Sequence, residues 1–356
     1  MTRRAAIWTG MVGGMRALVK YASGAGNVEL REVPEPATGP GDVLIDVAAV
    51  AICGTDRLAI EGGHDFQVPR ILGHEVSGSI RAIGGDVDRP DLAVGDRVTV
   101  ETDAYLCMRC EYCRREEYNR CPNRLGIGTT TDGGIADQLV MPARAVHKLP
   151  DRISFAEGAL TEPLAVAVHG VVERSPSLAG QVVVVIGPGA IGLLSAQVAR
   201  AVGATVVLVG RARHHAQLAR AREIGIEHAV DADAIDLPTM IQELTGGYGA
   251  HTVFECSGGA GVLESLPPLL RRGGRIVLLA FFRTPPSIDI ARVLNQELEV
   301  VGSRGKRASS YRTALRLMAD GQVDVEPVIG ARLPLSQWER GIELVGEGVK
   351  VVLEIR

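Results

Sequence analysis

Four of the six cysteines in this 356-residue chain lie within fifteen consecutive positions, in the segment CMRCEYCRREEYNRC. They are spaced C-x2-C-x2-C-x7-C, at Cys107, Cys110, Cys113 and Cys121. Structural zinc sites take four thiolates, and C-x2-C turns deliver two sulfurs to one ion. Most of the intervening residues are charged and cannot form an apolar core that would order the segment without a metal. The spacing therefore predicts a structural zinc lobe.

A second group of metal-binding or catalytic residue types is spread over the N-terminal half. Cys53 and Thr55 lie in AICGTDR, His74 and Glu75 in RILGHEVSG, and Glu162 in ALTEPLAVAVHG. Taken singly, such residues are typical of a core thiol, a turn histidine and a helix cap. The same chain also has the cysteine lobe and the dinucleotide motif described next. We therefore interpret these five residues as functionally related, and not as unrelated core or surface residues.

A glycine-rich turn follows an apolar strand in QVVVVIGPGAIGLLSAQVARAVGATVVLVG, residues 181–210. The run 182–186 is typical of a buried parallel strand, and the pattern predicts a helix and a second strand, 205–209, after the turn. The turn is G-x-G-x-x-G and consists of Gly187, Pro188, Gly189, Ala190, Ile191 and Gly192. Its glycines permit close approach of the backbone to a pyrophosphate, and the helix N-terminus favours the phosphate charge. In this setting the motif predicts a dinucleotide site.

The residues after the second strand indicate which dinucleotide is preferred. Sites for NAD usually place Asp or Glu here, on the 2′-hydroxyl of the ribose. This chain instead has Gly210, Arg211 and Arg213. Glycine leaves room for a 2′-phosphate, and arginine can bind one through two parallel hydrogen bonds. The sequence favours NADP(H) over NAD(H); the alternative is that both arginines are solvated and express no preference.

Alternating strands and helices are expected to position the dinucleotide turn. The pattern predicts helix 214–224, strand 251–256, helix 260–271, strand 275–280 and strand 298–302. This alternation predicts an α/β fold with a doubly wound parallel sheet over roughly residues 165–305. The chain is long for one hydrophobic core, so we expect two domains. Residues 1–14 precede the first strand pattern and are predicted to be a disordered lead.

The composition excludes several classes of protein. The chain is 46% hydrophobic and 22% charged, which is ordinary for a globular protein. A net charge of −4 gives no attraction to nucleic acid or to an anionic membrane, and no second cysteine cluster supports a zinc-ribbon DNA reader. The apolar stretches 153–172 and 181–199 are interrupted by charged residues or by Gly-Pro-Gly, so neither predicts a membrane span. The predicted location is the cytoplasm, where clustered cysteines stay reduced and bind metal.

Several motifs in order resemble the zinc-dependent medium-chain dehydrogenase/reductase (alcohol dehydrogenase) family, nearest its polyol (sorbitol) and threonine dehydrogenase-like branch. Besides the cysteine lobe and the glycine-rich turn, they are C-G-T-D (53–56), G-H-E (73–75), G-D-R-V (95–98), E-P-L-A (162–165) and G-S-R-G (302–305). The resemblance covers essentially residues 15–356.

The fold implied by this resemblance has two domains. A mostly-β, GroES-like catalytic domain is expected over residues 15–165, and residues 306–356 are expected to return to it. A Rossmann domain that binds the dinucleotide is expected over residues 166–305. Relatives are commonly homodimers or homotetramers, so a homo-oligomer is expected, without a nucleic-acid or membrane partner.

The resemblance also implies a catalytic zinc ion in addition to the structural one, giving two per chain. Cys53 and His74 are its expected ligands, with Glu75 or Glu162 as the third protein group. Which of the two carboxylates binds the metal directly, and which acts through water or by exchange, is left open by the residues.

Three neighbouring positions concern proton transfer and ligand orientation. Thr55 is expected to hydrogen-bond the substrate hydroxyl, and Asp56 to orient His74 through its other ring nitrogen. Many relatives have a histidine at position 58 that takes part in a proton relay. This chain departs from them, since it has Leu58. The proton is therefore expected to leave by another route, such as the cofactor ribose, a water chain or Glu162.

The function that follows is hydride transfer between a secondary alcohol or ketone and a nicotinamide cofactor. Glu162, the stretch EPLAVAVH and the motif GSRG resemble enzymes that act on polyols, cyclitols, sugar alcohols or hydroxy amino acids, and the resemblance implies such substrates. Because only 4% of the residues are aromatic, a pocket for aryl alcohols is disfavoured. A threonine or simple-alcohol dehydrogenase of the same family is an alternative. A metal-free quinone or enone reductase on the same fold, and a non-enzymatic binding or structural protein, are two others.

Overall fold

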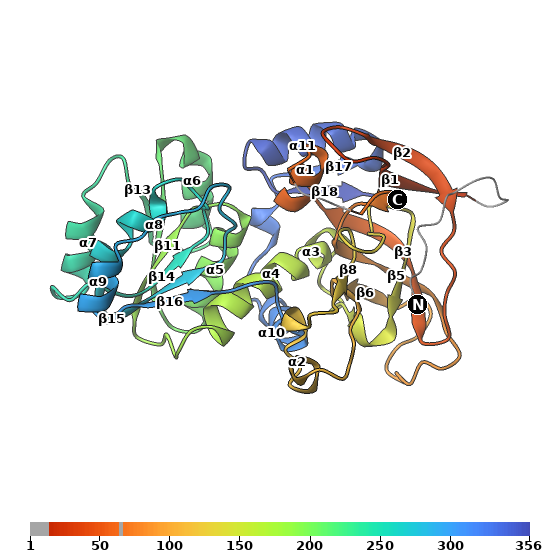
Figure 1. Ribbon diagram of the computed structural model, residues 1–356, viewed down its shortest axis with the longest axis horizontal. Coiled ribbons are helices and arrows are strands. Elements are labelled where there is room, and N and C mark those ends of the chain that lie inside the picture. Colours follow the sequence, from red (N-terminus) through yellow and green to blue (C-terminus); the bar gives the residue numbers. More distant parts are fainter. Residues whose placement is uncertain (1–13, 64–66) are drawn as a thin grey trace. The chain divides into compact units, whose positions relative to one another are not determined.

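The computed structural model describes residues 14–63 and 67–356. The expected disordered lead thus lies outside the described residues, apart from Gly14, which begins strand β1 (Gly14–Lys20). The chain divides into two compact units, one of residues up to Glu162 with Ile329–Arg356, the other of Pro163–Val328 (Figure 1). No helix in the described ranges is both long enough and apolar enough to cross a bilayer.

The first unit is built around a seven-stranded sheet, which runs in the order β10-β6-β5-β3-β18-β17 with β9 also on β3. The strands are β10 (Val146–Lys148), β6 (Arg97–Val100), β5 (Glu75–Ile83), β3 (Asp42–Ala51), β18 (Val351–Glu354), β17 (Ala331–Pro334) and β9 (Gln138–Pro142). All neighbours are antiparallel except β17 and β18. This largely antiparallel sheet confirms the prediction of a mostly-β, GroES-like domain.

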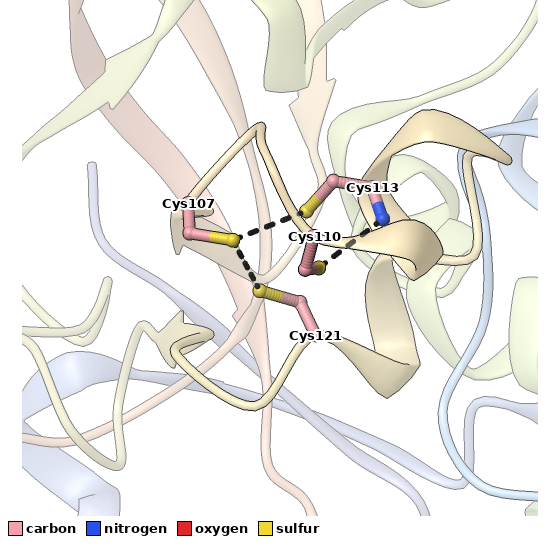
Figure 2. A group of neighbouring side chains, drawn as sticks. All are labelled: Cys107, Cys110, Cys113 and Cys121. Carbon is pink, nitrogen blue, oxygen red and sulfur yellow. Dashed lines mark hydrogen bonds between the residues drawn. The ribbon is translucent and has the colours of Figure 1, made fainter.

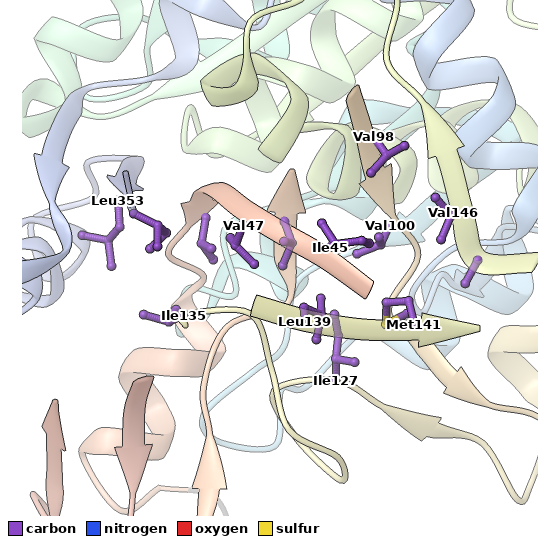
Figure 3. Close-up of a cluster of buried hydrophobic side chains, with 14 of the residues drawn as sticks. Ile45, Val47, Val98, Val100, Ile127, Ile135, Leu139, Met141, Val146 and Leu353 are labelled. Carbon is purple, nitrogen blue, oxygen red and sulfur yellow. The ribbon is translucent and has the colours of Figure 1, made fainter. Parts of the chain in front are cut away.

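Strand β3 shows why the sheet forms. Along DVLIDVAAV its side chains alternate between half-buried and fully buried, the period of two expected of a strand with one face on the core. Ile45 and Val47 lie in that core with Val98 of β6 and Leu353 of β18 (Figure 3). The C-terminal strand β18 therefore contributes to the core of the first unit.

Smaller elements surround this sheet. Strands β2 (Val28–Pro34), β1 and β4 (Arg70–Ile71) form a three-stranded sheet, and β7 (Asp103–Tyr105) pairs with β8 (Leu125–Gly126). The helices of the unit are α1 (Gly54–Ile60), α2 (Glu111–Arg114), α3 (Phe155–Ala159) and α11 (Trp338–Gly346). Helix α4 (Thr161–Val168) carries the chain across the boundary between the units.

The second unit contains a six-stranded parallel sheet in the order β13-β12-β11-β14-β15-β16. Its strands are β13 (His228–Asp231), β12 (Thr205–Gly210), β11 (Val182–Ile186), β14 (Ala250–Glu255), β15 (Leu270–Leu278) and β16 (Glu299–Gly302). Its further helices are α5 (Ala190–Ala201), α6 (His215–Glu223), α7 (Leu237–Leu244), α8 (Val262–Ser265), α9 (Ile290–Asn295) and α10 (Ala308–Ala319). The order reverses beside β11, which confirms the doubly wound Rossmann arrangement.

Two details differ from the sequence expectations. The helix expected over 260–271 ends at Ser265, because Pro267 and Pro268 cannot continue it, and β15 begins at Leu270. The compact second unit extends to Val328, beyond the expected boundary at 305. The reason is local: Gln197 of α5 exchanges two hydrogen bonds with the backbone of Asp324, which holds the segment after α10 on this unit.

Candidate active site

The four cysteines of the lobe converge, as their spacing predicts (Figure 2). All four Sγ atoms lie within 4.8 Å of one another. The Sγ of Cys107 lies 3.9 Å from that of Cys113 and 3.6 Å from that of Cys121. A tetrahedral zinc ion with Zn–S bonds of about 2.3 Å requires sulfurs about 3.8 Å apart. The donor set therefore fits a zinc ion without rearrangement of the backbone.

The pKa values of two lobe cysteines are also compatible with a bound metal ion. Backbone N–H groups of Arg109 and Cys110 lower the pKa of Cys107 to about 6, so this thiol ionises readily. Burial raises the pKa of Cys113 to about 12, since a lone thiolate is poorly solvated there. A bound cation stabilises all four thiolates and replaces the missing solvation.

A buried ion-pair cluster, which the sequence did not indicate, attaches the lobe to the first unit. Asp103, at the start of β7, accepts a hydrogen bond from Arg124 Nε. Arg124 also donates to Thr102 Oγ1 over 2.6 Å, and Arg144 donates to the carbonyl of Asp103 over 2.6 Å. Arg124 is one of many charged residues around the cysteines, and nothing in its local pattern distinguishes it from the solvated ones.

A second group of metal-binding atoms lies at the N-terminus of α1 and the start of β5. Cys53, the N-cap residue of α1, His74 and Glu75 each offer one ligand atom, and these atoms lie within 4.8 Å of one another. Glu162 is buried on α4 and does not belong to this group, but its charge acts on Glu75. The structure thus brings together the predicted sulfur, nitrogen and one of the two predicted carboxylates.

Asp56 connects the two segments that carry these ligands. Its Oδ2 accepts from the backbone N–H of Cys53 over 2.9 Å, and its Oδ1 accepts from the N–H of Gly73 over 3.0 Å. The same Oδ1 lies 3.7 Å from His74 Nδ1, an ion-pair distance, and no described residue hydrogen-bonds this nitrogen. Thr55 Oγ1 lies 3.4 Å from the other ring nitrogen, Nε2. Asp56 therefore positions the backbone of both ligands as well as the imidazole.

Charges set the protonation of the histidine. Burial lowers the pKa of His74, but attraction to Asp56 and Cys53 outweighs burial and raises it well above its ordinary value. Burial raises the pKa of Asp56, yet His74 and the backbone donors bring it below its usual range. Without a metal the imidazole is thus held in its protonated form, and a metal ion would take the place of that proton.

Lys350 is the functional residue that sequence reasoning missed. Its Nζ lies 2.5 Å from Glu75 Oε2 and 3.1 Å from the carbonyl of Ile52, which precedes Cys53 in the chain. The side chains of Lys350 and Glu75 are 8% and 1% exposed. Burial lowers the pKa of Lys350, but the charges of Glu75 and Cys53 outweigh it and raise the pKa. The burial of Glu75 raises its pKa, as does Glu162, while Lys350 opposes the rise.

The dinucleotide turn has the geometry that its glycines require. Gly187 has a φ of +99°, and a Cβ there would meet Ser257 Cβ at 2.8 Å. A Cβ on Gly192 would lie 1.8 Å from the carbonyl oxygen of Gly187, so α5 could not pack so closely on the turn. The turn therefore requires glycine at positions 187 and 192. With these glycines the N-terminus of α5 lies beside the ends of β11 and β12.

The end of β12 carries the residues expected to select the cofactor. Gly210 is its last, buried residue, and Arg211 and Arg213 follow on an exposed turn. Asp233, after β13, lies 3.7 Å from the guanidinium of Arg211. The two arginines are thus solvent-exposed, and one of them faces a carboxylate.

Leu58, at the position that departs from the relatives, lies in α1 together with Thr55 and Asp56. Its hydrocarbon side chain has no atom that could accept or donate a proton.

Two family models match the chain. Residues 39–151 match the alcohol dehydrogenase GroES-like domain, and residues 190–320 match the zinc-binding dehydrogenase model. A sorbitol dehydrogenase from Halalkalibacterium halodurans is 36% identical, over 95% of this chain and 99% of that protein. A D-arabitol-phosphate dehydrogenase from Enterococcus avium is 33% identical, over 96% and 97%.

A solved structure has the same fold. It is that of a putative zinc-binding dehydrogenase from Sinorhizobium meliloti bound to NADP, with a TM-score of 0.88 and 33% identity. The alignment covers 97% of this chain and all of that one.

Proposed function

Because the chain belongs to the zinc-type medium-chain dehydrogenase/reductase family, we propose that a zinc ion held by Cys53, His74 and Glu75 is its catalytic centre. Membership makes the chain a zinc-type, NAD(P)-dependent alcohol dehydrogenase. The observation that carries the assignment of the site is the convergence of one sulfur, one nitrogen and one carboxylate oxygen within 4.8 Å. Three such ligands leave the fourth position of a tetrahedral ion open for a substrate oxygen.

The zinc ion would act as a Lewis acid that makes the alkoxide form of a bound alcohol accessible near neutral pH. The chain's own residues bind the substrate and orient the metal ligands. Asp56 holds the backbone of both ligand segments, and Thr55, beside His74 Nε2, is placed to hydrogen-bond the substrate hydroxyl. Leu58 takes no part in proton transfer, so the proton leaves through Thr55 to water or to the cofactor ribose.

Glu75 is the direct carboxylate ligand in this proposal, and Glu162 acts at the open position. Lys350 occupies Oε2 of Glu75, which leaves Oε1 for the metal. Glu162 is buried and close enough to raise the pKa of Glu75, so it lies within electrostatic reach of the same ion. It would hydrogen-bond a substrate hydroxyl or a water.

A second, structural zinc ion in the cysteine lobe is proposed from its four convergent sulfurs. Its distances support tetrahedral coordination with no open position, so this ion orders the lobe and takes no part in hydride transfer.

For the cofactor, NADP(H) is proposed over NAD(H). Gly210, Arg211 and Arg213 support this preference, because a cationic turn favours a 2′-phosphate and no acidic residue ends β12. The NADP-bound structure of the similar protein agrees with the proposal. Exchange of Arg211 for Asp is expected to shift the kcat/KM ratio towards NAD by at least about tenfold, since it replaces attraction by repulsion.

For the substrate, a secondary alcohol of a polyol, cyclitol or sugar alcohol is proposed, together with the corresponding ketone. The names of the two similar dehydrogenases, for sorbitol and for D-arabitol phosphate, support a polyhydroxylated substrate. The low aromatic content agrees, because polyols are bound by polar groups more than by rings.

A homo-oligomer in the cytoplasm is also proposed. Strand β16 ends the parallel sheet, and an unpaired strand edge favours pairing with a second copy. Val300 on β16 is exposed, as are Ile290 and Leu294 on α9, which supports an apolar contact. Six free cysteines with a zinc lobe support a reducing compartment.

The test combines a substrate panel with metal analysis of the purified chain. Polyols, cyclitols, amino alcohols such as threonine, and simple ketones are offered with each cofactor, and nicotinamide absorbance is followed. Turnover of a polyol that is lost on Cys53→Ser, with retained binding of NADPH, supports the proposal. Zinc in the lobe alone with turnover of enones would favour a metal-free reductase, and cofactor binding without any turnover would favour a non-enzymatic protein.

A further inference from the structure

The turn after β12 carries an anion as well as cations. Strands β12 and β13 are parallel neighbours, with Gly210 opposite Asp231, so the residues that follow each strand meet at one edge of the sheet. Ala232 N–H donates to the carbonyl of Gly210 over 3.0 Å, which holds the two turns together. Asp233 is placed beside the turn of Arg211 by this pairing.

The carboxylate of Asp233 makes two contacts with that turn. Its Oδ2 accepts from the backbone N–H of Ala212 over 3.2 Å, and its Oδ1 lies 3.7 Å from the guanidinium of Arg211. The N–H of Asp233 donates to Asp231 Oδ1 over 2.9 Å, which fixes the backbone of the acidic turn. A backbone N–H with a guanidinium is a typical receptor for a phosphate oxygen. In this chain an internal carboxylate occupies it.

The histidine of the turn adds no positive charge to that of the arginines. Burial lowers the pKa of His214, and the positive charges of Arg213 and Arg211 lower it further, so the imidazole is neutral near pH 7. Its Nδ1 accepts from Arg211 N–H over 3.1 Å. The turn therefore presents two arginines against the carboxylates of Asp231 and Asp233, with no further cation from the histidine.

The side chains of Arg211 and Asp233 are 58% and 48% exposed, so their ion pair is weak and can be displaced. We infer that Asp233 is a specificity-determining residue, an internal competitor that occupies the receptor for the 2′-phosphate and limits the preference for NADP(H) over NAD(H). The inference rests on the proposed dinucleotide site. A ligand with a 2′-phosphate must displace the carboxylate, whereas one with a 2′-hydroxyl need not.

The experiment uses the full chain and two probes, adenosine 2′,5′-bisphosphate and 5′-AMP, whose dissociation constants are measured by calorimetry. Asp233→Asn is expected to tighten binding of the bisphosphate about three- to tenfold, with 5′-AMP unchanged within about twofold. Asp236→Asn is the matched control, because it removes the same charge three residues further on, where Asp236 bonds Thr239, and is expected to change neither constant.

A second variant tests the route of the effect. In an Arg211→Ala background, Asp233→Asn should tighten binding of the bisphosphate less than it does in the wild type, because only the Ala212 N–H is then left for the carboxylate to occupy. The inference is overturned if the dissociation constant of the bisphosphate is unchanged in Asp233→Asn, or if both probes change equally. Either result is still compatible with the proposed dinucleotide site. Failure of the wild type to bind either probe contradicts the dinucleotide site itself, and the inference with it.

Discussion

The ion pair of Lys350 with Glu75 sets the charge around the proposed catalytic metal. Two buried carboxylates, Glu75 and Glu162, repel each other here, and Lys350 supplies a compensating positive charge that acts on both. Its Nζ takes one oxygen of Glu75 and leaves the other for the metal. Removal of one partner of a buried ion pair strongly destabilises the fold, because the other charge is then buried without compensation.

Removal of that partner gives the first prediction. Lys350→Met should destabilise the metal-free chain by about 3–5 kcal/mol, because Glu75 is then buried without its counter-ion. In the zinc-loaded chain the loss should be smaller, since the metal stabilises the carboxylate. Denaturant midpoints of both forms measure this, with Lys350→Arg as the variant that keeps the charge. Equal losses with and without zinc would contradict the assigned role.

The raised pKa of His74 gives the second prediction. Below that pKa the metal-free imidazole is protonated, so zinc must displace a proton, and affinity for the catalytic zinc should fall as pH falls. The decline should begin above the ordinary value of 6.5, since Asp56 and Cys53 shift the titration upward. Chelator competition across a pH series, with released protons counted, tests this. A catalytic-zinc affinity that stays constant until below that ordinary value would show that His74 is neutral in the metal-free site.

At the scale of elements, the dinucleotide turn and α5 form a unit that depends on backbone contact. Gly192→Ala places a Cβ 1.8 Å from the carbonyl oxygen of Gly187, so α5 must move away from the turn. The expected result is dinucleotide binding weakened by at least about tenfold, with zinc content unchanged.

Gly85→Ala is the control for this prediction. A Cβ at Gly85 meets nothing within 4 Å, and this exposed residue belongs to the first unit, away from the dinucleotide turn in the chain. Dinucleotide titrations of both variants, followed by fluorescence quenching of NADPH, separate the two cases. A similar loss of dinucleotide affinity in both variants would indicate that close packing of α5 on the turn is not the reason for the glycine at 192.

The sequence was informative where structure is local. The run of apolar residues, the glycine turn and the next apolar run predict β11 and β12 within one residue and a helix between them, where α5 lies, because their periodicity is set by neighbours in the chain. Strand β13 and helix α7 were not predicted, since HAVD is short and LPTMIQEL lies among polar residues. The helix expected over 260–271 failed because two prolines end it.

At the scale of the whole molecule, the proposed active site depends on contacts that no local pattern contains. Lys350 reaches Glu75, 275 positions away in the chain, because β18 pairs with one side of β3 and β5 pairs with the other. The cysteine lobe is attached in the same way, through Asp103, Arg124 and Arg144. The resemblance to the family predicts Cys53 and His74 as ligands, with Glu75 or Glu162, and Asp56 as the residue that orients His74, whereas the contact of Lys350 with Glu75 required the three-dimensional structure.

The two proposed metal sites have separate roles, and they differ in their donors. The lobe offers four sulfurs and no open position, so Cys110→Ser should lower the stability of the chain through loss of the metal that orders the lobe. The other site offers mixed donors and an open position, so Cys53→Ser should leave stability and NADPH affinity nearly intact while turnover disappears.

The most direct measurement is zinc stoichiometry of the purified chain and of Cys53→Ser by inductively coupled plasma mass spectrometry, combined with polyol turnover. Two zinc ions per wild-type chain are expected, and one ion with no turnover in Cys53→Ser. A wild-type chain that turns over substrate with zinc in the lobe alone, or a Cys53→Ser chain that keeps both ions and its activity, would contradict this expectation.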